Sequence, residues 1–169
     1  ARIRGMLLQY RRGVRSLRRK GDLLSAERRR YFAYGANIIR SEMAERCPAA
    51  RELGVVTLPG WRFAIGAAGY GTILRDPKAA VVGVLWSLTP GCEATLDEFE
   101  AVAGRDLYRK DVLEVGGEPA MVYVASDPRP GRPQAGYLES IVKAAEELGF
   151  PADYVANSLR PWLRTTPRA

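Results

Sequence analysis

Short runs of apolar and β-branched residues, separated by glycine and proline, dominate the chain from residue 31 onward. Several runs alternate between apolar and polar positions, which is typical of strands with one buried face. These runs predict strands at Tyr31–Tyr34, Val55–Leu58, Trp61–Ile65, Thr72–Leu74, Ala80–Leu88, Asp111–Val115 and Ala120–Ala125. Apolar residues three and four positions apart predict helices at Ile38–Arg46, Glu93–Ala103 and Ala135–Leu148, and a short one after Pro151 that stops before Pro161.

The order of these elements indicates the class of fold. A strand is followed by a helix, several strands, a second helix, two strands and a final helical region, which argues against a regular alternation of strands and helices. We therefore predict an α+β fold in which helices flank a curled mixed β-sheet or a small β-barrel. The length of 169 residues and the hydrophobic content of 47% suit one core, so we expect a single domain at residues 31–169.

Residues 1–30 differ from the rest of the chain. They hold eleven arginines or lysines and two acidic residues, whereas the remainder holds 15 basic and 17 acidic residues. Apolar residues recur between the arginines at helical spacing, so we interpret this segment as a basic amphipathic N-terminal extension. It could dock on the domain or a partner chain, contact nucleic acid or an anionic membrane, or serve as an organelle transit peptide, which such arginine-rich starts resemble.

The composition restricts the chemistry. The sequence has no histidine, which excludes histidine-activated nucleophiles and histidine-based zinc sites, so carboxylates, tyrosines, lysines or backbone groups must act instead. Cys47 and Cys92 lack the spacing of a metal site or a disulfide scaffold, and we expect both to be buried. We expect no metal and no cofactor. No run approaches the roughly 20 apolar residues of a transmembrane helix, so we expect no transmembrane segment and a cytoplasmic location.

The first candidate site is the turn Tyr34-Gly35-Ala36-Asn37, which joins an apolar strand to a helix. Asn37 is a plausible N-cap of that helix. A glycine turn at a helix start exposes backbone N–H groups that suit an anion such as a carboxylate. An ordinary strand-to-helix turn without a ligand is the alternative interpretation.

The second candidate site is Glu100, in the segment Leu96-Asp97-Glu98-Phe99-Glu100. At about 100° per residue, Glu100 lies only about 40° from Leu96 around the helix, whereas Glu98 points to the opposite side. Glu100 therefore borders the buried face, where apolar neighbours raise the pKa of a carboxyl and suit it to proton transfer. The alternative is a carboxylate at the rim that pairs with an arginine.

These two segments resemble the motifs of the gamma-glutamylcyclotransferase family, whose members have a Tyr-Gly-Ser-Asn turn after the first strand and a Leu-Asp-x-x-Glu segment. The likeness covers about residues 31–162 in consistent order. It also includes Gly69–Ile73, Val82–Trp86, Tyr108, Tyr137, Leu148–Pro151 and Tyr154. Two features depart from the family pattern: Ala36 replaces the usual serine, and the segment 104–107 is about one residue longer before Tyr108.

The resemblance implies a cofactor-independent enzyme that releases 5-oxoproline from a gamma-glutamyl compound, because the substrate's α-amino group attacks its own γ-carbonyl. Glu100 would be the general acid and base. The residues implied to bind the substrate are Tyr34, Gly35, Ala36, Asn37, Tyr108 and Tyr137. The leaving group stays open among an amino acid, an amine, a gamma-glutamyl-capped metabolite and glutathione. Two other hypotheses stay open: a domain of the same fold that binds a small carboxylate without turnover, and a scaffold whose residues 1–30 bind nucleic acid or anionic lipid.

Overall fold

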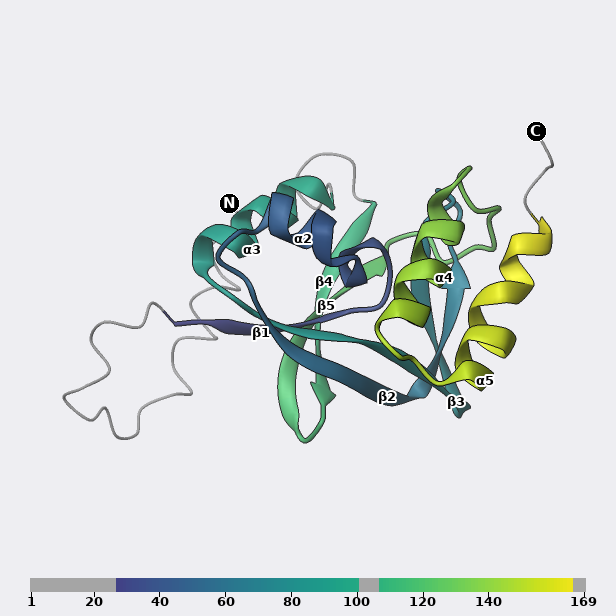
Figure 1. Ribbon diagram of the computed structural model, residues 1–169, viewed down its shortest axis with the longest axis horizontal. Helices are drawn as coiled ribbons and strands as arrows, with labels where there is room; N and C mark the ends of the chain where they lie inside the picture. Colours follow the sequence, from purple (N-terminus) through teal and green to yellow (C-terminus); the bar gives the residue numbers. More distant parts are fainter. Residues whose placement is uncertain (1–26, 101–106, 166–169) are drawn as a thin grey trace.

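The computed structural model describes residues 27–100 and 107–165, which form a curled mixed sheet with helices around it (Figure 1). The strand order in the sheet is β2-β3-β1-β5-β4. The strands are β1 (Arg29–Ala33), β2 (Arg51–Ile65), β3 (Gly71–Leu88), β4 (Tyr108–Val115) and β5 (Glu118–Ala125). β1 lies in the centre, antiparallel to β3 and parallel to β5. β2 and β4 are the two edges, so the sheet is open, and of the two predicted forms the curled sheet is correct and the closed barrel is not.

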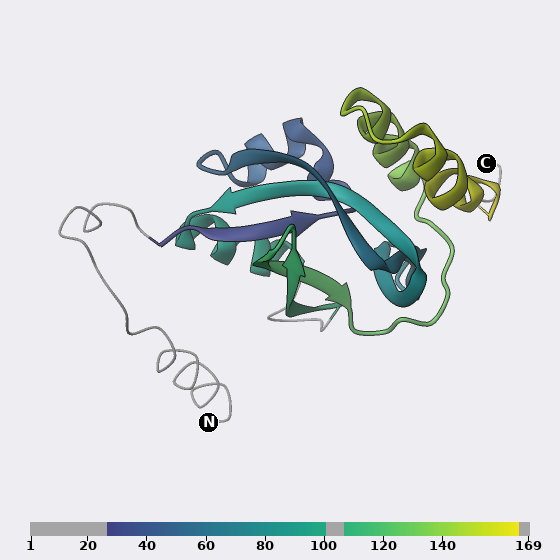
Figure 2. The same ribbon diagram turned by 90° about the horizontal axis from the view of Figure 1, so that it is seen from below.

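The helices form two groups on the sheet. They are η1 (Ala36–Ile38), α2 (Arg40–Arg46), α3 (Pro90–Phe99), α4 (Tyr137–Glu147), α5 (Ala152–Tyr154), η2 (Val155–Leu159) and η3 (Arg160–Thr165). In Figure 1, α2 and α3 lie together over one half of the sheet, whereas α4 and the C-terminal helices lie at the other end. Figure 2 shows that a long connection from β5 carries the chain across to α4. The core between these layers includes Phe32, Ile38, Met43, Ile73, Leu96 and Ile141, each at most 1% exposed.

β2 and β3 are longer than the sequence predicts. The two runs expected around residue 59 are one continuous strand, because Pro59 and Gly60 lie at an irregularity in the pairing and do not end the strand. Gly60 has a φ of 82°, which is left-handed backbone that glycine adopts without strain. The two strands form a long hairpin whose far end reaches the C-terminal helices (Figure 1).

Several helix boundaries differ from the prediction, and residues 101–103 of the helix predicted at Glu93–Ala103 lie outside the described ranges. The helix expected at Ile38–Arg46 is divided into η1 and α2 by Ile39, whose φ and ψ are extended. α3 begins earlier than expected, at Pro90, because the Thr89 side chain caps it by accepting a hydrogen bond from the backbone N–H of Cys92. The expectation that the last helix stops before Pro161 was wrong: η3 includes this proline near its start, where a missing N–H breaks no hydrogen bond of the helix.

The structure also bears on the predictions for the cysteines, for membrane-spanning segments, for metal sites and for the N-terminal segment. Cys47 and Cys92 are free and buried, as predicted. Among the described residues, no helix is long and apolar enough to cross a membrane, and no cluster of His, Cys, Asp or Glu is suited to hold a metal ion. Residues 1–26 lie outside the described ranges, so the interpretation of the segment 1–30 stays a prediction.

Candidate active site

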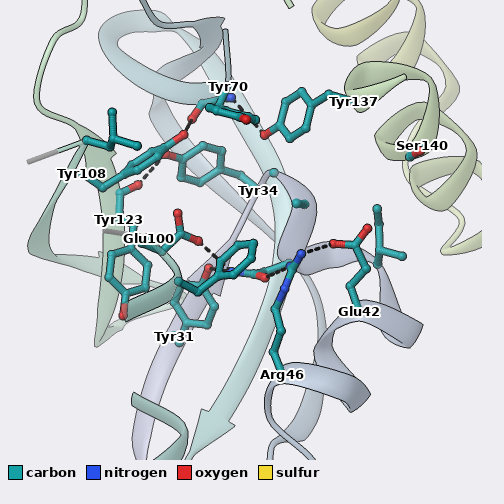
Figure 3. Close-up of a pocket in the computed structure, with 17 residues that line it drawn as sticks. Tyr31, Tyr34, Glu42, Arg46, Tyr70, Glu100, Tyr108, Tyr123, Tyr137 and Ser140 are labelled. Atoms are coloured by element: carbon teal, nitrogen blue, oxygen red, sulfur yellow. Dashed lines mark hydrogen bonds and ion pairs between the residues drawn. The ribbon is translucent and has the colours of Figure 1, made fainter. Parts of the chain in front are cut away.

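A cavity of about 410 Å³ opens where β1, η1, α2, the end of α3, β4 and α4 converge (Figure 3). Its lining brings together all of the residues predicted for the site, namely Tyr34, Gly35, Ala36, Asn37, Glu100, Tyr108 and Tyr137. These residues come from four separate parts of the sequence. Their convergence on one cavity is what a binding or catalytic site requires.

Glu100 lies at the C-terminal end of α3 and faces the cavity. Its backbone N–H still donates to the carbonyl of Leu96 at 2.8 Å, so the helical spacing used in the prediction holds up to this residue. Leu96 is fully buried and Glu98 is exposed, which agrees with the predicted faces. Burial raises the pKa of Glu100 to about 7, against the opposing effects of the Arg46 charge and a hydrogen bond from Asn37. Near neutral pH this carboxyl can both accept and donate a proton.

Asn37 does not cap a helix, and the N-cap prediction was wrong. Its side chain is buried and takes part in a hydrogen-bond network. Its Nδ2 donates to Oε1 of Glu100 at 3.0 Å and to the Tyr31 hydroxyl at 2.9 Å. Its Oδ1 accepts from Nη1 of Arg46 at 2.7 Å. The amide is therefore unable to turn toward a helix N-terminus, because each of its atoms already has a partner in the core of the site.

The Tyr137 hydroxyl lies against the Tyr-Gly-Ala-Asn turn. It accepts a hydrogen bond from the backbone N–H of Gly71 at 3.0 Å, and the nearby backbone of Ala36 lowers its pKa. A Cβ atom at Gly35 would lie 2.9 Å from this hydroxyl oxygen, so only glycine leaves room for it. Because this bond is accepted, the phenol's own proton is free to point into the cavity.

The other predicted tyrosines form the walls. The Tyr108 hydroxyl donates to the carbonyl of Gly71 at 2.7 Å, and the Tyr34 hydroxyl donates to the carbonyl of Tyr123. Burial raises the pKa values of Tyr34, Tyr108 and Tyr137 above the ordinary value for a phenol. These hydroxyls therefore stay protonated at neutral pH and serve as hydrogen-bond donors, not as bases.

The sequence analysis missed several residues of the lining. They include Tyr31, Glu42, Arg46, Tyr70, Phe99 and Tyr123. The spacing of Glu42 and Arg46 by four residues on a predicted helix was a signal for their ion pair, which measures 2.5 Å. A hydrogen bond fixes the Tyr123 side chain, because its hydroxyl donates to Asp97 at 2.6 Å. Lys110 forms an ion pair with the same carboxylate at 2.7 Å.

Comparisons with known proteins identify relatives of this chain. The model of the AIG2-like family matches residues 80–157, which include Glu100, Tyr108 and Tyr137. The gamma-glutamylcyclotransferase of Homo sapiens is 26% identical over 138 residues, which are 73% of this chain and 73% of that protein. The corresponding protein of Bos taurus is 26% identical over 147 residues, or 78% of each chain. A solved structure named gamma-glutamyl cyclotransferase aligns with 84% of this chain and 90% of its own chain, at 24% sequence identity. The TM-score of 0.71 shows a common fold.

Proposed function

Because the chain belongs to the AIG2-like, gamma-glutamylcyclotransferase-type family, we propose that it releases 5-oxoproline from a small gamma-glutamyl compound without a cofactor. One observation carries the proposal: a carboxyl with a pKa of about 7 lies in a half-open cavity beside a glycine turn and several protonated tyrosines. These groups suit a reaction that needs proton transfer and orientation but no protein nucleophile.

The proposed reaction forms one bond and breaks one. The α-nitrogen of the substrate attacks the γ-carbonyl carbon, which closes a five-membered lactam, and the bond from that carbon to the leaving nitrogen breaks. Glu100 takes the proton that the α-nitrogen releases and then gives it to the leaving nitrogen. An intramolecular attack already has a high effective concentration, so the protein must mainly fold the glutamyl arm and move this proton.

Tyr137 and the turn beside it would stabilise the negative charge. In this proposal the Tyr137 hydroxyl and the backbone N–H groups of Gly35 and Asn37 donate hydrogen bonds. The acceptor is the developing oxyanion or the α-carboxylate of the substrate. The Ala36 backbone lies close enough to the Tyr137 oxygen to lower the pKa of that phenol, which favours its role as a donor. A role through the backbone also explains why alanine can stand where the family usually has serine. Tyr34 and Tyr108 shape the wall on which the glutamyl arm folds.

The test is a comparison of Glu100→Gln with Glu98→Gln. Glutamine keeps the shape and the bond from Asn37 but cannot accept a proton, so we expect 5-oxoproline release to fall by at least about a hundredfold. Glu98 is exposed on the same helix, so its variant controls for the loss of one charge. The substrates should be a γ-glutamyl amino acid, a γ-glutamylamine and glutathione. Near-normal turnover by Glu100→Gln would show that the assigned role is wrong.

A second candidate function is binding of a small carboxylate without turnover, which Ala36 in place of serine favours. Calorimetry would separate the two. Binding of a γ-glutamyl compound with no 5-oxoproline produced supports this second function, whereas turnover that depends on Glu100 excludes it.

A further inference from the structure

Arg46 sits outside the motifs but has contacts with both halves of the site. Its Nη1 donates to Oδ1 of Asn37 at 2.7 Å, and its Nη2 pairs with Oε2 of Glu42 at 2.5 Å. Its guanidinium carbon lies 3.7 Å from the centre of the ring of Phe99, the residue that directly precedes Glu100 in the chain. Figure 3 shows Arg46 reaching from α2 into the network that ends at Glu100. One side chain thus links α2 to the turn and to the end of α3.

The contact with Asn37 decides which way the amide faces. An arginine has only donors, so the atom of Asn37 that faces Arg46 must be the oxygen. The amide nitrogen is then directed to Glu100 and Tyr31, at 3.0 Å and 2.9 Å. With the amide reversed, an oxygen would face a carboxylate, and an NH₂ group would face a guanidinium. Both contacts would be repulsive.

This orientation leaves the two oxygens of Glu100 in different states. Oε1 accepts the hydrogen bond from Asn37, whereas Oε2 has no hydrogen-bond partner among the residues in the described ranges. One oxygen is therefore fixed and the other faces the cavity. We propose that Arg46 is a positioning residue: it holds the Asn37 amide so that one oxygen of Glu100 is anchored and the other receives the substrate's amino proton. The statement rests on the proposed function.

Charge supports the same assignment. Arg46 and Glu42 are the charged groups, besides Glu100, in the described lining of the cavity. The other titratable groups of the described lining, contributed by other elements, are the phenols of Tyr31, Tyr34, Tyr70, Tyr108, Tyr123 and Tyr137. The positive charge of Arg46 lowers the pKa of Glu100 and so offsets part of the effect of burial. Removing it should raise that pKa.

The experiment measures Glu100 directly and through activity. The ¹³C carboxyl resonance of Glu100, assigned by its loss in Glu100→Gln, is titrated by NMR in the full chain, and the pH profile of 5-oxoproline release is recorded in parallel. In Arg46→Met we expect both midpoints to rise by about one pH unit, since a neighbouring opposite charge shifts a pKa by roughly 1 to 3 units. Activity at pH 7 then falls about fivefold from the smaller ionised fraction alone, and part of it returns at higher pH.

Three further variants complete the test. Arg40→Met removes an arginine with its own ion pair from the same helix, on an exposed face, and should leave both midpoints unchanged. The double variant Arg46→Met/Glu42→Gln keeps the net charge of the pair and should still raise both midpoints. It replaces Arg46→Met in the test if that single variant does not fold. Arg46→Lys should keep the midpoints near those of wild type but lower kcat, because an ammonium lacks the planar fork that holds two partners.

Two results would overturn the proposal. One is a Glu100 midpoint that stays in place in both Arg46→Met and the double variant while activity drops equally at every pH, which is the signature of a structural role only. The other is an equal shift in Arg40→Met. If wild type released no 5-oxoproline, the proposed function would fail, yet the NMR titration would still decide whether Arg46 acts on Glu100.

Discussion

Glu100→Gln should make the folded protein more stable at alkaline pH while it removes activity. In the folded state the Glu100 pKa is about 7, against an ordinary value of 4.5. A carboxyl whose pKa is raised by folding contributes most to stability when both states are protonated, below pH 4.5. That contribution is lost as the pH rises toward 7, because the folded state holds on to a proton that the unfolded state has released.

The magnitude follows from the difference between the two pKa values. At about 1.4 kcal/mol per pH unit, the rise from 4.5 to about 7 corresponds to a total loss of about 3 kcal/mol. Between pH 5 and pH 8 the loss is about 2.5 kcal/mol, because part of it has already occurred below pH 5. Glutamine does not titrate, so the free energy of unfolding of Glu100→Gln should gain about this amount over wild type when the pH is changed from 5 to 8.

Urea unfolding followed by tryptophan fluorescence measures this difference, since Trp61 and Trp86 are buried in the folded protein. Wild type, Glu100→Gln and Glu98→Gln should be compared at both pH values in the same buffer series. Glu98 is exposed, so its variant should follow the wild-type pH dependence. The reasoning would be refuted if Glu100→Gln and wild type changed in parallel between the two pH values.

Two more substitutions test the contact between Tyr137 and the turn. Tyr137→Phe removes the proposed hydrogen-bond donor and should lower kcat about a hundredfold. The control is Tyr154→Phe, at a buried tyrosine outside the cavity, which should have no effect on turnover. Equal kcat values in the two variants would rule out a donor role for Tyr137. Gly35→Ala places a methyl group 2.9 Å from the Tyr137 hydroxyl and should displace it, so its kcat should fall in the same way, and an unchanged kcat would show that this close approach does not matter.

The sequence predicted which residues share one cavity better than it predicted the bounds of the elements around them. Glu100 was identified because helical spacing from Leu96 places it near the buried face, and this spacing is local information that a sequence carries directly. The turn Tyr34–Asn37 was identified from glycine at a strand end, a signal that is weak alone and gained weight from the resemblance to the family motif. Both signals depend only on near neighbours, and the cavity brings both segments together.

The errors concern interactions between distant segments. The N-cap role of Asn37 was inferred from residues nearby in the chain, but its partners Glu100 and Arg46 lie 63 and 9 positions away, and the buried network prevails over the local preference. The continuity of β2 through Pro59 was missed for the same reason. Pairing with β3 on both sides of the proline holds the strand together, and no local signal in β2 reveals a partner strand.

Opposing effects on the charge of Glu100 leave its pKa at about 7, which suits the two proton transfers proposed for it. Burial in a ring of neutral phenols would alone keep the carboxyl protonated and useless as a base. Full pairing with the guanidinium of Arg46 would keep it ionised and useless as an acid. The Asn37 amide lies between the Arg46 guanidinium and the Glu100 carboxyl and is hydrogen-bonded to both. The charge of Arg46 therefore acts on Glu100 without a direct hydrogen bond between them. In a chain without histidine, this arrangement lets an ordinary glutamate titrate near pH 7.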